Sequence, residues 1–391
     1  MSTPRMNTLP RLTPLLLKHA ALQHDEFFLV DVGCSGGVEE HWKAFGPKLR
    51  AVGFDPLVTE VERLNSLRPS DKIRYEAAFV VCHEKQMMGA LLDPAESIAH
   101  KDNQPFPRSS AKLFNDRRQM DYVKTVFNSG QQVVLADRRV QLDDYFPLEQ
   151  HAALDFIKVD TDGYDFGVLL GARKILEHGQ VLGLSVEAQF HGAVSENVNL
   201  FCNVDRYLRS LGFTLFDLEP YRYSRGALPA PFEHKIPAQT RNGQVAWAEA
   251  IYMRDLGDPA YAQKWGYQPT EAKVLKLACL FEVFGLADCA AELLVNAAGR
   301  FPALEDPRPF LDALTPRFHD QQVTYAEYMQ AFLERPELFF PDGSLGFLSA
   351  EAKQKLDPEK FHPSGRVRRQ PSSIKKLKNK IKLLINNSKS R

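Results

Sequence analysis

The feature that most limits the fold is an alternation of short apolar runs with amphipathic stretches between residues 27 and 253. Strands are predicted at Phe27–Gly33, Arg50–Pro56, Ile73–Val81, Leu154–Asp160 and Val181–Ala188, and helices at Glu39–Phe45, Val58–Leu67, Asp165–Leu176 and Asn197–Leu211. Strands that alternate with helices in this way favour a parallel sheet with helices on both faces. We therefore expect an α/β fold with a doubly wound, mainly parallel sheet.

Late strands at Thr214–Leu218 and Glu249–Met253 bring this sheet to seven strands. Glu219–Ala246 lies between them and is too long for a simple hairpin loop. Cys82–Phe146 interrupts the alternation and contains one predicted hairpin at Gln132–Leu142. An insert of this length between core strands is usually functional or mobile.

The predicted domain organisation has four parts. They are an N-terminal helical extension (1–26), the α/β domain (27–256), a smaller helical accessory domain (257–360) and a basic tail (361–391). In the accessory domain, Glu271–Gly285 and Leu286–Ala298 are expected to form a helix pair joined at Gly285.

Composition excludes several classes of protein. The chain has 391 residues, of which 44% are hydrophobic and 25% charged, so disordered, collagen-like and small disulfide-rich chains are excluded. No run approaches the roughly 18 apolar residues of a membrane span, and the N-terminal segment does not resemble a signal peptide. The five cysteines include no CxxC pair, which favours reduced thiols. A cytoplasmic location is expected.

The overall charge of +0 hides a strong asymmetry. The segment 365–391 holds ten Lys or Arg and no acidic residue, which leaves 39 basic against 49 acidic residues in the first 364. Apolar residues recur in this tail at spacings of three and four: Ile374, Leu377, Ile381, Leu384 and Ile385. A basic amphipathic helix of this kind suits an anionic membrane surface, so a peripheral position at the inner membrane face is expected. Nucleic acid is a poor alternative because no aromatic residue interleaves the lysines, and a disordered solubilising tail is another alternative.

The first chemical motif follows the first predicted strand and reads Asp31-Val-Gly33-Cys-Ser-Gly36-Gly37. Glycines permit a tight turn and a close backbone approach to a ligand. Asp55 ends the next strand, where a carboxylate can accept hydrogen bonds from ribose hydroxyls. The predicted cofactor-binding residues are Asp31, Gly33, Cys34, Gly36, Asp55, Pro56 and Ala78.

The identity of the cofactor follows from the spacing and charge of this loop. The dinucleotide fingerprint GxGxxG requires glycine where the chain has Ser35. An acidic residue inside the loop suits an ammonium group better than a pyrophosphate. S-adenosylmethionine is therefore favoured, and a nicotinamide-dependent oxidoreductase or a non-catalytic scaffold with the same fold remain the alternatives.

Five segments together resemble the FkbM family of S-adenosylmethionine-dependent methyltransferases over about residues 27–255: VDVGCSGG, GFDP, VQLDDYF, DFIKVDTDGYDFGVLLGARKIL and LSVE. The most specific is Lys158-Val-Asp160-Thr-Asp162-Gly163-Tyr-Asp165, similar to the family's K-x-D-x-E-G-x-E. Aspartate stands here at both glutamate positions, and Cys34-Ser35-Gly36-Gly37 replaces the common Ala-Asn-x-Gly. The resemblance implies a Rossmann-like class I methyltransferase fold and methyl transfer to a hydroxyl of a sugar in a glycan, glycolipid or glycosylated metabolite, with a surface polysaccharide favoured.

The strand ends also suggest which residues act in catalysis. Asp160 and Glu187 end neighbouring strands, so their carboxylates are expected to be neighbours, with His191 four residues further on. A sugar hydroxyl needs a base or a metal to lower its pKa. In one assignment His191 or Asp160 is the base and Lys158 holds the carboxylates or the substrate oxygen. In the other, which is less favoured, Asp160, Glu187 and Asp162 bind Mg²⁺.

The acceptor is expected to contact residues beyond the last strands. Arginine suits an anionic group and aromatic rings suit a sugar face. The predicted substrate-binding residues are Asp162, Arg222, Tyr223 and Arg225.

Overall fold

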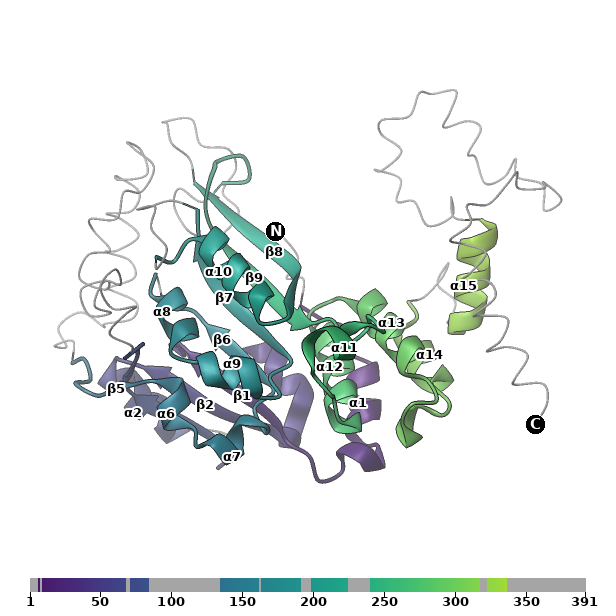
Figure 1. Cartoon of the computed structure of the whole chain (residues 1–391), viewed down its shortest axis with the longest axis horizontal. Helices are drawn as coiled ribbons and strands as arrows, with labels where there is room; N and C mark the ends of the chain where they lie inside the picture. Colours follow the sequence, from purple (N-terminus) through teal and green to yellow (C-terminus); the bar gives the residue numbers. More distant parts are fainter. Residues whose placement is uncertain are drawn as a thin grey trace. The chain divides into compact units, whose positions relative to one another are not determined.

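The structure is a computed structural model that describes residues 6–7, 9–67, 71–83, 134–161, 163–190, 198–223, 240–316 and 322–335. The chain forms two compact units, residues 1–305 and residues 306–391. The first unit is built around a seven-stranded sheet (Figure 1).

The sheet has the order β3-β2-β1-β6-β7-β9-β8. Its strands are β1 (Phe27–Val32), β2 (Leu49–Asp55), β3 (Ile73–Ala77), β6 (Phe156–Val159), β7 (Gly183–Gln189), β8 (Phe213–Tyr223) and β9 (Gln244–Arg254). The strands from β3 to β7 are parallel, and β9 and β8 join antiparallel at the edge. This arrangement confirms the predicted seven-stranded, mostly parallel sheet of a Rossmann-like fold.

Helices cover both faces of the sheet, and all six residues of β1 are buried for this reason. On one face lie α8 (Asp165–Leu170), α9 (Arg173–His178) and α10 (Phe201–Ser210), as Figure 1 shows. Leu170, Ile175 and Leu208 from these helices join Val30 and Val186 of the sheet in one buried apolar cluster. Area removed from water at such positions is worth about 25 cal/mol per Å², so this cluster is a main source of stability.

The opposite face is covered in its lower half by η2 (Glu40–Lys48), α1 (Leu12–Leu17), η1 (Ala20–Leu22) and α12 (Glu271–Val283). An aromatic layer joins these elements to the sheet. Trp42 lies 4.9 Å from Phe156 between ring centroids, Phe284 stacks on Phe156 at 5.3 Å, and Phe45 stacks on Phe27 at 3.8 Å. Lys158, two positions after Phe156 on β6, lies on this same face.

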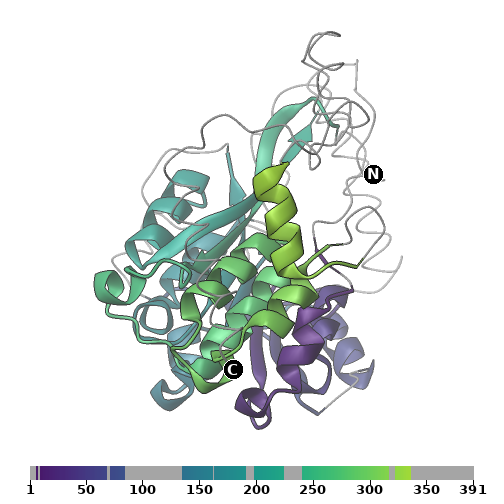
Figure 2. The same ribbon diagram turned by 90° about the vertical axis from the view of Figure 1, so that its right-hand side faces the viewer.

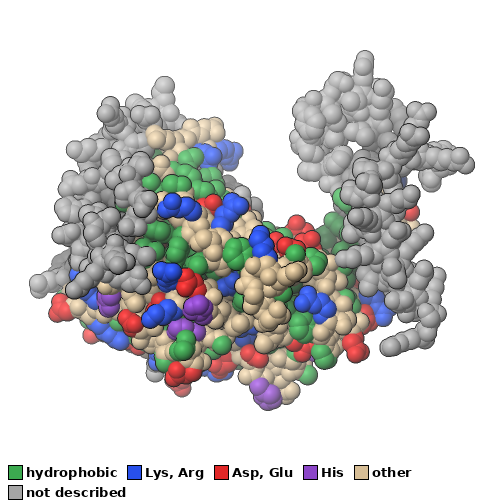
Figure 3. Space-filling model, viewed as in Figure 1, with side chains coloured by type: hydrophobic (Ala, Val, Ile, Leu, Met, Phe, Trp, Pro, Cys, Tyr) green, Lys and Arg blue, Asp and Glu red, His purple; other side chains and the backbone are tan. Residues whose placement is uncertain are grey.

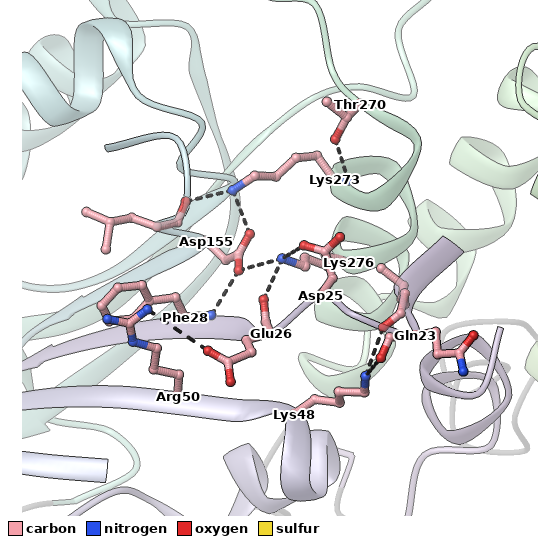
Figure 4. A network of polar contacts seen from close by, with 12 residues as sticks. Gln23, Asp25, Glu26, Phe28, Lys48, Arg50, Asp155, Thr270, Lys273 and Lys276 are labelled. Carbon is pink, nitrogen blue, oxygen red and sulfur yellow. Dashed lines mark hydrogen bonds and ion pairs between the residues drawn. The ribbon is translucent and has the colours of Figure 1, made fainter. Parts of the chain in front are cut away.

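A buried ionic network fixes α12 to the start of β6 and β1 (Figure 4). The carboxylate of Asp155 is fully buried and accepts hydrogen bonds from the Phe28 amide at 2.9 Å, from Lys273 at 2.6 Å and from Lys276 at 3.0 Å. Lys273 also donates to the carbonyl of Leu154 at 2.8 Å. Because every charged group here has an opposite partner, the network avoids the large cost of an unpaired buried charge.

A carboxylate on α12 caps the beginning of the N-terminal helix α1. Glu282 Oε1 accepts from the amides of Arg11 at 2.7 Å and Leu12 at 2.8 Å, and Oε2 accepts from the amide of Thr13 at 2.7 Å. These donors belong to the first turn of α1, which has no intrahelical partners for its amides. A residue some 270 positions away therefore caps α1, with a favourable charge at the positive helix end.

The remaining elements of the first unit are α2 (Val58–Leu67), β4 (Phe79–Val80), β5 (Arg139–Val140), α6 (Leu142–Tyr145), α7 (Leu148–His151), α11 (Tyr261–Trp265), α13 (Ala287–Ala297) and η3 (Pro302–Leu304). The second unit has α14 (Arg308–Leu314) and α15 (Tyr325–Glu334). In α15 Thr324 and Glu327 form a reciprocal capping box. Within the described ranges no helix is long and apolar enough to cross a membrane.

Several predicted elements differ in the structure. The strand expected at Ile73–Val81 is broken after Ala77, and β4 pairs in parallel with β5 in a separate small sheet. The hairpin predicted at Gln132–Leu142 is therefore wrong over its described residues, 134–142. The helix expected at Asp165–Leu176 is divided into α8 and α9 around Gly171, and η2 is a 3₁₀ helix.

The largest difference concerns the edge hairpin. Glu219–Ala246 was expected to be a loop, but β8 and β9 pair antiparallel from Phe213↔Arg254 to Tyr223↔Gln244. The hairpin continues past β7, whose pairing with β9 ends at Trp247, and Figure 2 shows it projecting beyond the other strands. Proline and charged residues obscured the strand pattern in the sequence.

Helices α12 and α13, which the sequence placed in an accessory domain beginning at residue 257, lie in the same compact unit as the sheet. Two sets of contacts described above, the Asp155 network and the Glu282 cap on α1, attach α12 to this unit. Both use polar side chains of α12, Lys273, Lys276 and Glu282, that have buried partners in the α/β fold or on α1.

Candidate active site

The candidate site lies at the carboxyl ends of the parallel strands. The chain order of the sheet reverses between β1 and β6, since β2 and β3 continue to one side and β7 to the other. In open α/β sheets ligands bind at this switch point, outside the carboxyl ends of the strands. The residues at these ends are Gly33 to Gly37 after β1, Asp55 on β2, Asp160 after β6 and Glu187 on β7.

The glycine loop after β1 is a tight turn that requires its glycines. Gly33 has φ +83° and its amide donates to the carbonyl of Phe54 at 2.9 Å. A Cβ at Gly33 would lie 1.8 Å from the carbonyl oxygen of Asp160, so no other residue fits. A Cβ at Gly36 would meet nothing within 4 Å. The loop therefore packs tightly against β6 at Gly33 and is open at Gly36.

Neighbouring side chains hold the rest of this loop. The amide of Gly36 donates to Glu60 Oε1 at 2.9 Å, and the amide of Val38 donates to the hydroxyl of Tyr75 at 3.2 Å. Sequence reasoning missed both Glu60 and Tyr75, because they lie on α2 and β3 and no motif marks them. The side chain of Cys34, a predicted cofactor-binding residue, is buried next to Gly53, and burial raises the pKa of its thiol well above the ordinary value.

Lys158 connects the two sides of the switch point. Its Nζ lies 3.4 Å from Asp31 Oδ1, 3.3 Å from Asp160 Oδ2 and 3.8 Å from Glu39 Oε1. Although burial lowers the pKa of Lys158, the three carboxylates together raise it above the ordinary value, so the ammonium stays charged. The structure thus brings Lys158 together with Asp31 and Asp160.

Asp31 is fully buried beside this lysine. Burial raises the pKa of Asp31 to about 6, against the lowering effect of Lys158. Its Oδ2 has no hydrogen-bond partner among the described residues. A buried polar atom without a partner is costly, which makes Asp31 a place where a ligand donor would be stabilising.

Asp55 lies at the carboxyl end of β2 and is nearly buried. Its Oδ1 accepts from the amide of Leu57 at 2.8 Å, and its carbonyl accepts from the amide of Ala78 at 3.1 Å. Carboxylate oxygens are hydrogen-bond acceptors, the kind of partner that ribose hydroxyls need. Pro56 is linked to the segment before β5, because its carbonyl accepts from Ala136 at 2.8 Å.

Asp165, the last acidic residue of the Lys158 motif, has a structural role. It is fully buried and accepts hydrogen bonds from the amides of Thr161 at 2.9 Å and Gly163 at 3.1 Å and from Asn199 at 2.9 Å. These bonds close the turn between β6 and α8. Asp162 of the same motif lies outside the described residues.

Glu187 and Asp160 occupy equivalent positions on neighbouring strands, since Val159 pairs with Val186. Tyr223, a predicted substrate-binding residue, is buried, and its hydroxyl accepts from Trp247 Nε1 at 3.4 Å. Arg222 is partly exposed on β8. The predicted site residues His191 and Arg225 lie outside the described residues.

The described part of the chain contains no group of three or more His, Cys, Asp or Glu arranged to hold a metal ion. The Mg²⁺ assignment on Asp160 and Glu187 therefore stays a prediction. On the face seen in Figure 3, acidic and basic side chains are interspersed over the described residues. At the strand ends, the charged groups that lie together are Asp31, Lys158 and Asp160.

The comparison with protein families agrees with this geometry. Residues 89–215 match the family described as Methyltransferase FkbM domain. Within the match lie β6, α8, α9, β7 and α10, with the Lys158 motif among them, whereas the glycine loop and Asp55 precede it. No curated protein matches the chain.

The fold is thus that of an α/β protein with a Rossmann-like, mostly parallel sheet and a polar site at its strand ends. The matched segment confirms the resemblance to the FkbM family and supports methyltransferase activity in general.

Proposed function

We propose that this protein is an S-adenosylmethionine-dependent O-methyltransferase that acts on a hydroxyl group of a sugar. One observation carries the proposal. The turn at Gly33, the Asp55 carboxylate and the Lys158–Asp160 ion pair meet at the switch point of the sheet, where ligands of open α/β folds bind.

The residues present fit this cofactor. Asp31 offers a fully buried oxygen without a hydrogen-bond partner among the described residues, at the point where an ammonium group would be stabilised. The open space at Gly36 admits a ligand close to the backbone. Asp55 would accept the ribose hydroxyls. When bound, S-adenosylmethionine supplies a methyl group on a positively charged sulfur.

The chain's own residues would position the acceptor. Lys158 holds Asp160 and Asp31 in fixed orientations, so the polar surface beside the methyl group is preorganised. Asp160 and His191 are the predicted candidates for the base that receives the hydroxyl proton. Arg222 and Arg225 are predicted to contact the sugar.

Calorimetric titration tests the cofactor. We expect micromolar binding of S-adenosylmethionine and S-adenosylhomocysteine, no binding of NAD, and loss of binding in Asp55→Ala. The matched control is Asp288→Ala, which removes an exposed carboxylate at the start of α13. Binding of NAD alone would contradict the proposal and favour an oxidoreductase.

Transfer of a labelled methyl group tests the acceptor. Incubation with neutral methyl glycosides should give base-stable label on a sugar oxygen. Label found on nitrogen or on a carboxylate of the alternative acceptors glucosamine and glucuronic acid would overturn the assignment to a hydroxyl.

We also propose that the tail, residues 365–391, holds the enzyme at an anionic membrane surface. This segment lies outside the described residues, and the proposal rests on its ten basic residues and apolar spacing. A membrane position would suit a lipid-linked or surface-glycan acceptor.

A further inference from the structure

Three glutamates lie side by side on the last three strands of the sheet. Glu187 of β7 pairs directly with Glu249 of β9, and Glu249 pairs directly with Glu219 of β8. Side chains of directly opposed residues point to the same face, with Cβ atoms about 5 Å apart. Like charges in this position destabilise a sheet, so the row is not explained by folding.

The row lies on the same sheet face as Lys158 and Asp160. Ser185 pairs with Lys158 across β6 and β7, and Glu187 follows Ser185 by two positions. Residues two apart on a strand share a face. Ser185 Oγ donates to Glu249 Oε1 at 3.1 Å, which ties Glu249 to the site that Lys158 occupies.

Glu249 is surrounded by carboxylates from several elements. Burial raises the pKa of Glu249 to about 7, and the charges of Glu39 and Asp160 add to this effect. The hydrogen bond from Ser185 and the charge of Lys158 lower it. Glu187 and Glu219 face it from the adjacent strands, and the hydroxyl of Tyr221 lies within the field of the same acidic groups.

Asp160 differs from Glu249 in its surroundings. Its carboxylate is ion-paired with Lys158 at 3.3 Å, and its side chain is 46% exposed. Burial among other carboxylates brings the pKa of a carboxyl group closer to neutral pH, where its unprotonated form is most effective as a general base.

An aromatic pair adjoins the row on the same face. Trp247 precedes Glu249 by two positions and pairs with Tyr221, which follows Glu219 by two. Their rings stack at 3.7 Å between centroids, with an angle of 11° between planes. Both are partly exposed, and such rings present an apolar face with a polar edge, which suits the C–H face of a sugar ring.

We infer that Glu249 is a further catalytic residue, whose carboxylate receives the proton of the acceptor hydroxyl while the sugar ring lies against Trp247. This inference rests on the proposed methyl transfer. The acceptor oxygen forms a bond to the methyl carbon as the carbon–sulfur bond breaks, and the electron pair of that bond stays on sulfur. The hydroxyl proton goes to Glu249 and then to water, leaving a neutral ether and a neutral thioether.

The decisive measurement is the titration of Glu249 in the full chain. Burial also raises the pKa of Asp31 to about 6 and that of Asp165 to about 7, so infrared difference spectra between pH 5 and pH 9 should contain several carboxyl bands. One of these bands should titrate near neutrality and be absent from Glu249→Gln. The band should be present in Glu177→Gln, a matched change on α9 on the opposite face of the sheet. Absence of such a band from the native chain would overturn the inference without any known acceptor.

Kinetics with methyl glycosides and labelled cofactor then separate catalysis from structure. Glu249→Gln should lower kcat about 10²- to 10⁴-fold and remove the rise of kcat with pH, while cofactor binding changes less than about threefold. Glu249→Asp should retain the pH dependence at a reduced kcat. A Gln variant with unchanged kcat, or with the same pH dependence, would refute the role. If the native chain did not bind S-adenosylmethionine at all, the proposed function itself would be refuted.

Discussion

Replacement of Asp155 by Asn tests whether the buried network in Figure 4 holds α12 on the sheet. The change keeps the shape of the side chain and removes its charge. Lys273 would then keep the Leu154 carbonyl as acceptor and lose an ion pair of 2.6 Å, and Lys276 would keep Asp25 at 3.0 Å. Both ammonium groups are nearly buried.

The expected decrease in the free energy of unfolding comes from the ion pairs that Lys273 and Lys276 lose with Asp155. Removing one partner of a buried ion pair typically costs about 3 to 5 kcal/mol, because the remaining charge is left without a partner. Lys276 keeps one carboxylate and Lys273 keeps one carbonyl, so the lower end of that range, about 3 kcal/mol, is expected. With a urea m value of about 3 kcal/mol/M, the unfolding midpoint should fall by about 1 M.

Urea unfolding followed by tryptophan fluorescence and circular dichroism measures this shift. Trp42 reports on the aromatic layer between the sheet and Phe284, so both signals should move together. Glu40→Gln is the matched control, since Glu40 and Lys43 form an exposed pair and such pairs are worth about 0 to 1 kcal/mol. If Asp155→Asn shifted the midpoint no more than this control, the network would not be the anchor of α12.

Three further predictions concern the site and the tail. The pKa of Glu249 is about 7 in the folded chain against 4.5 for the free group, so the stability that protonated Glu249 contributes is fully present below pH 4.5 and is lost as pH rises through 7. Between pH 4.5 and pH 8 the free energy of unfolding of Glu249→Gln should therefore rise by about 3 kcal/mol relative to that of the native chain. Parallel curves of stability against pH in chemical denaturation would contradict this. Gly33→Ala should abolish binding of S-adenosylmethionine in calorimetry, because its Cβ would lie 1.8 Å from the Asp160 carbonyl oxygen. Gly36→Ala has open space and only a positive φ, so it should lower the free energy of unfolding by about 1 to 2 kcal/mol. Equal binding of S-adenosylmethionine by the two variants would show that the close packing at Gly33 is irrelevant. Deletion after Gly365 should abolish co-sedimentation with anionic vesicles, and equal binding of the full chain to neutral vesicles would refute the membrane role.

Much of the fold was predictable because its signals are local. Helix α2 has the predicted bounds, Val58–Leu67, since apolar residues recur there at helical spacing. Strands β1, β2 and β6 are apolar runs that end in, or are followed directly by, Asp or Gly, and Gly33 marks the turn that only glycine permits. The Lys158 motif also identifies its own strand end. These features depend on residues within a few positions of one another.

The sequence could not show which distant residues meet. Glu249 is an ordinary polar position in a strand until the register of β7, β9 and β8 places it between two other glutamates. The long β8–β9 hairpin, the cap that Glu282 provides to α1, and the attachment of α12 through Asp155 are all contacts between segments far apart in the chain. Burial and charge neighbours determine the proton affinity of a carboxylate, and these exist only after folding. The sequence therefore determined the sheet and the class of site, whereas tertiary structure decided which carboxylate there can act as a base.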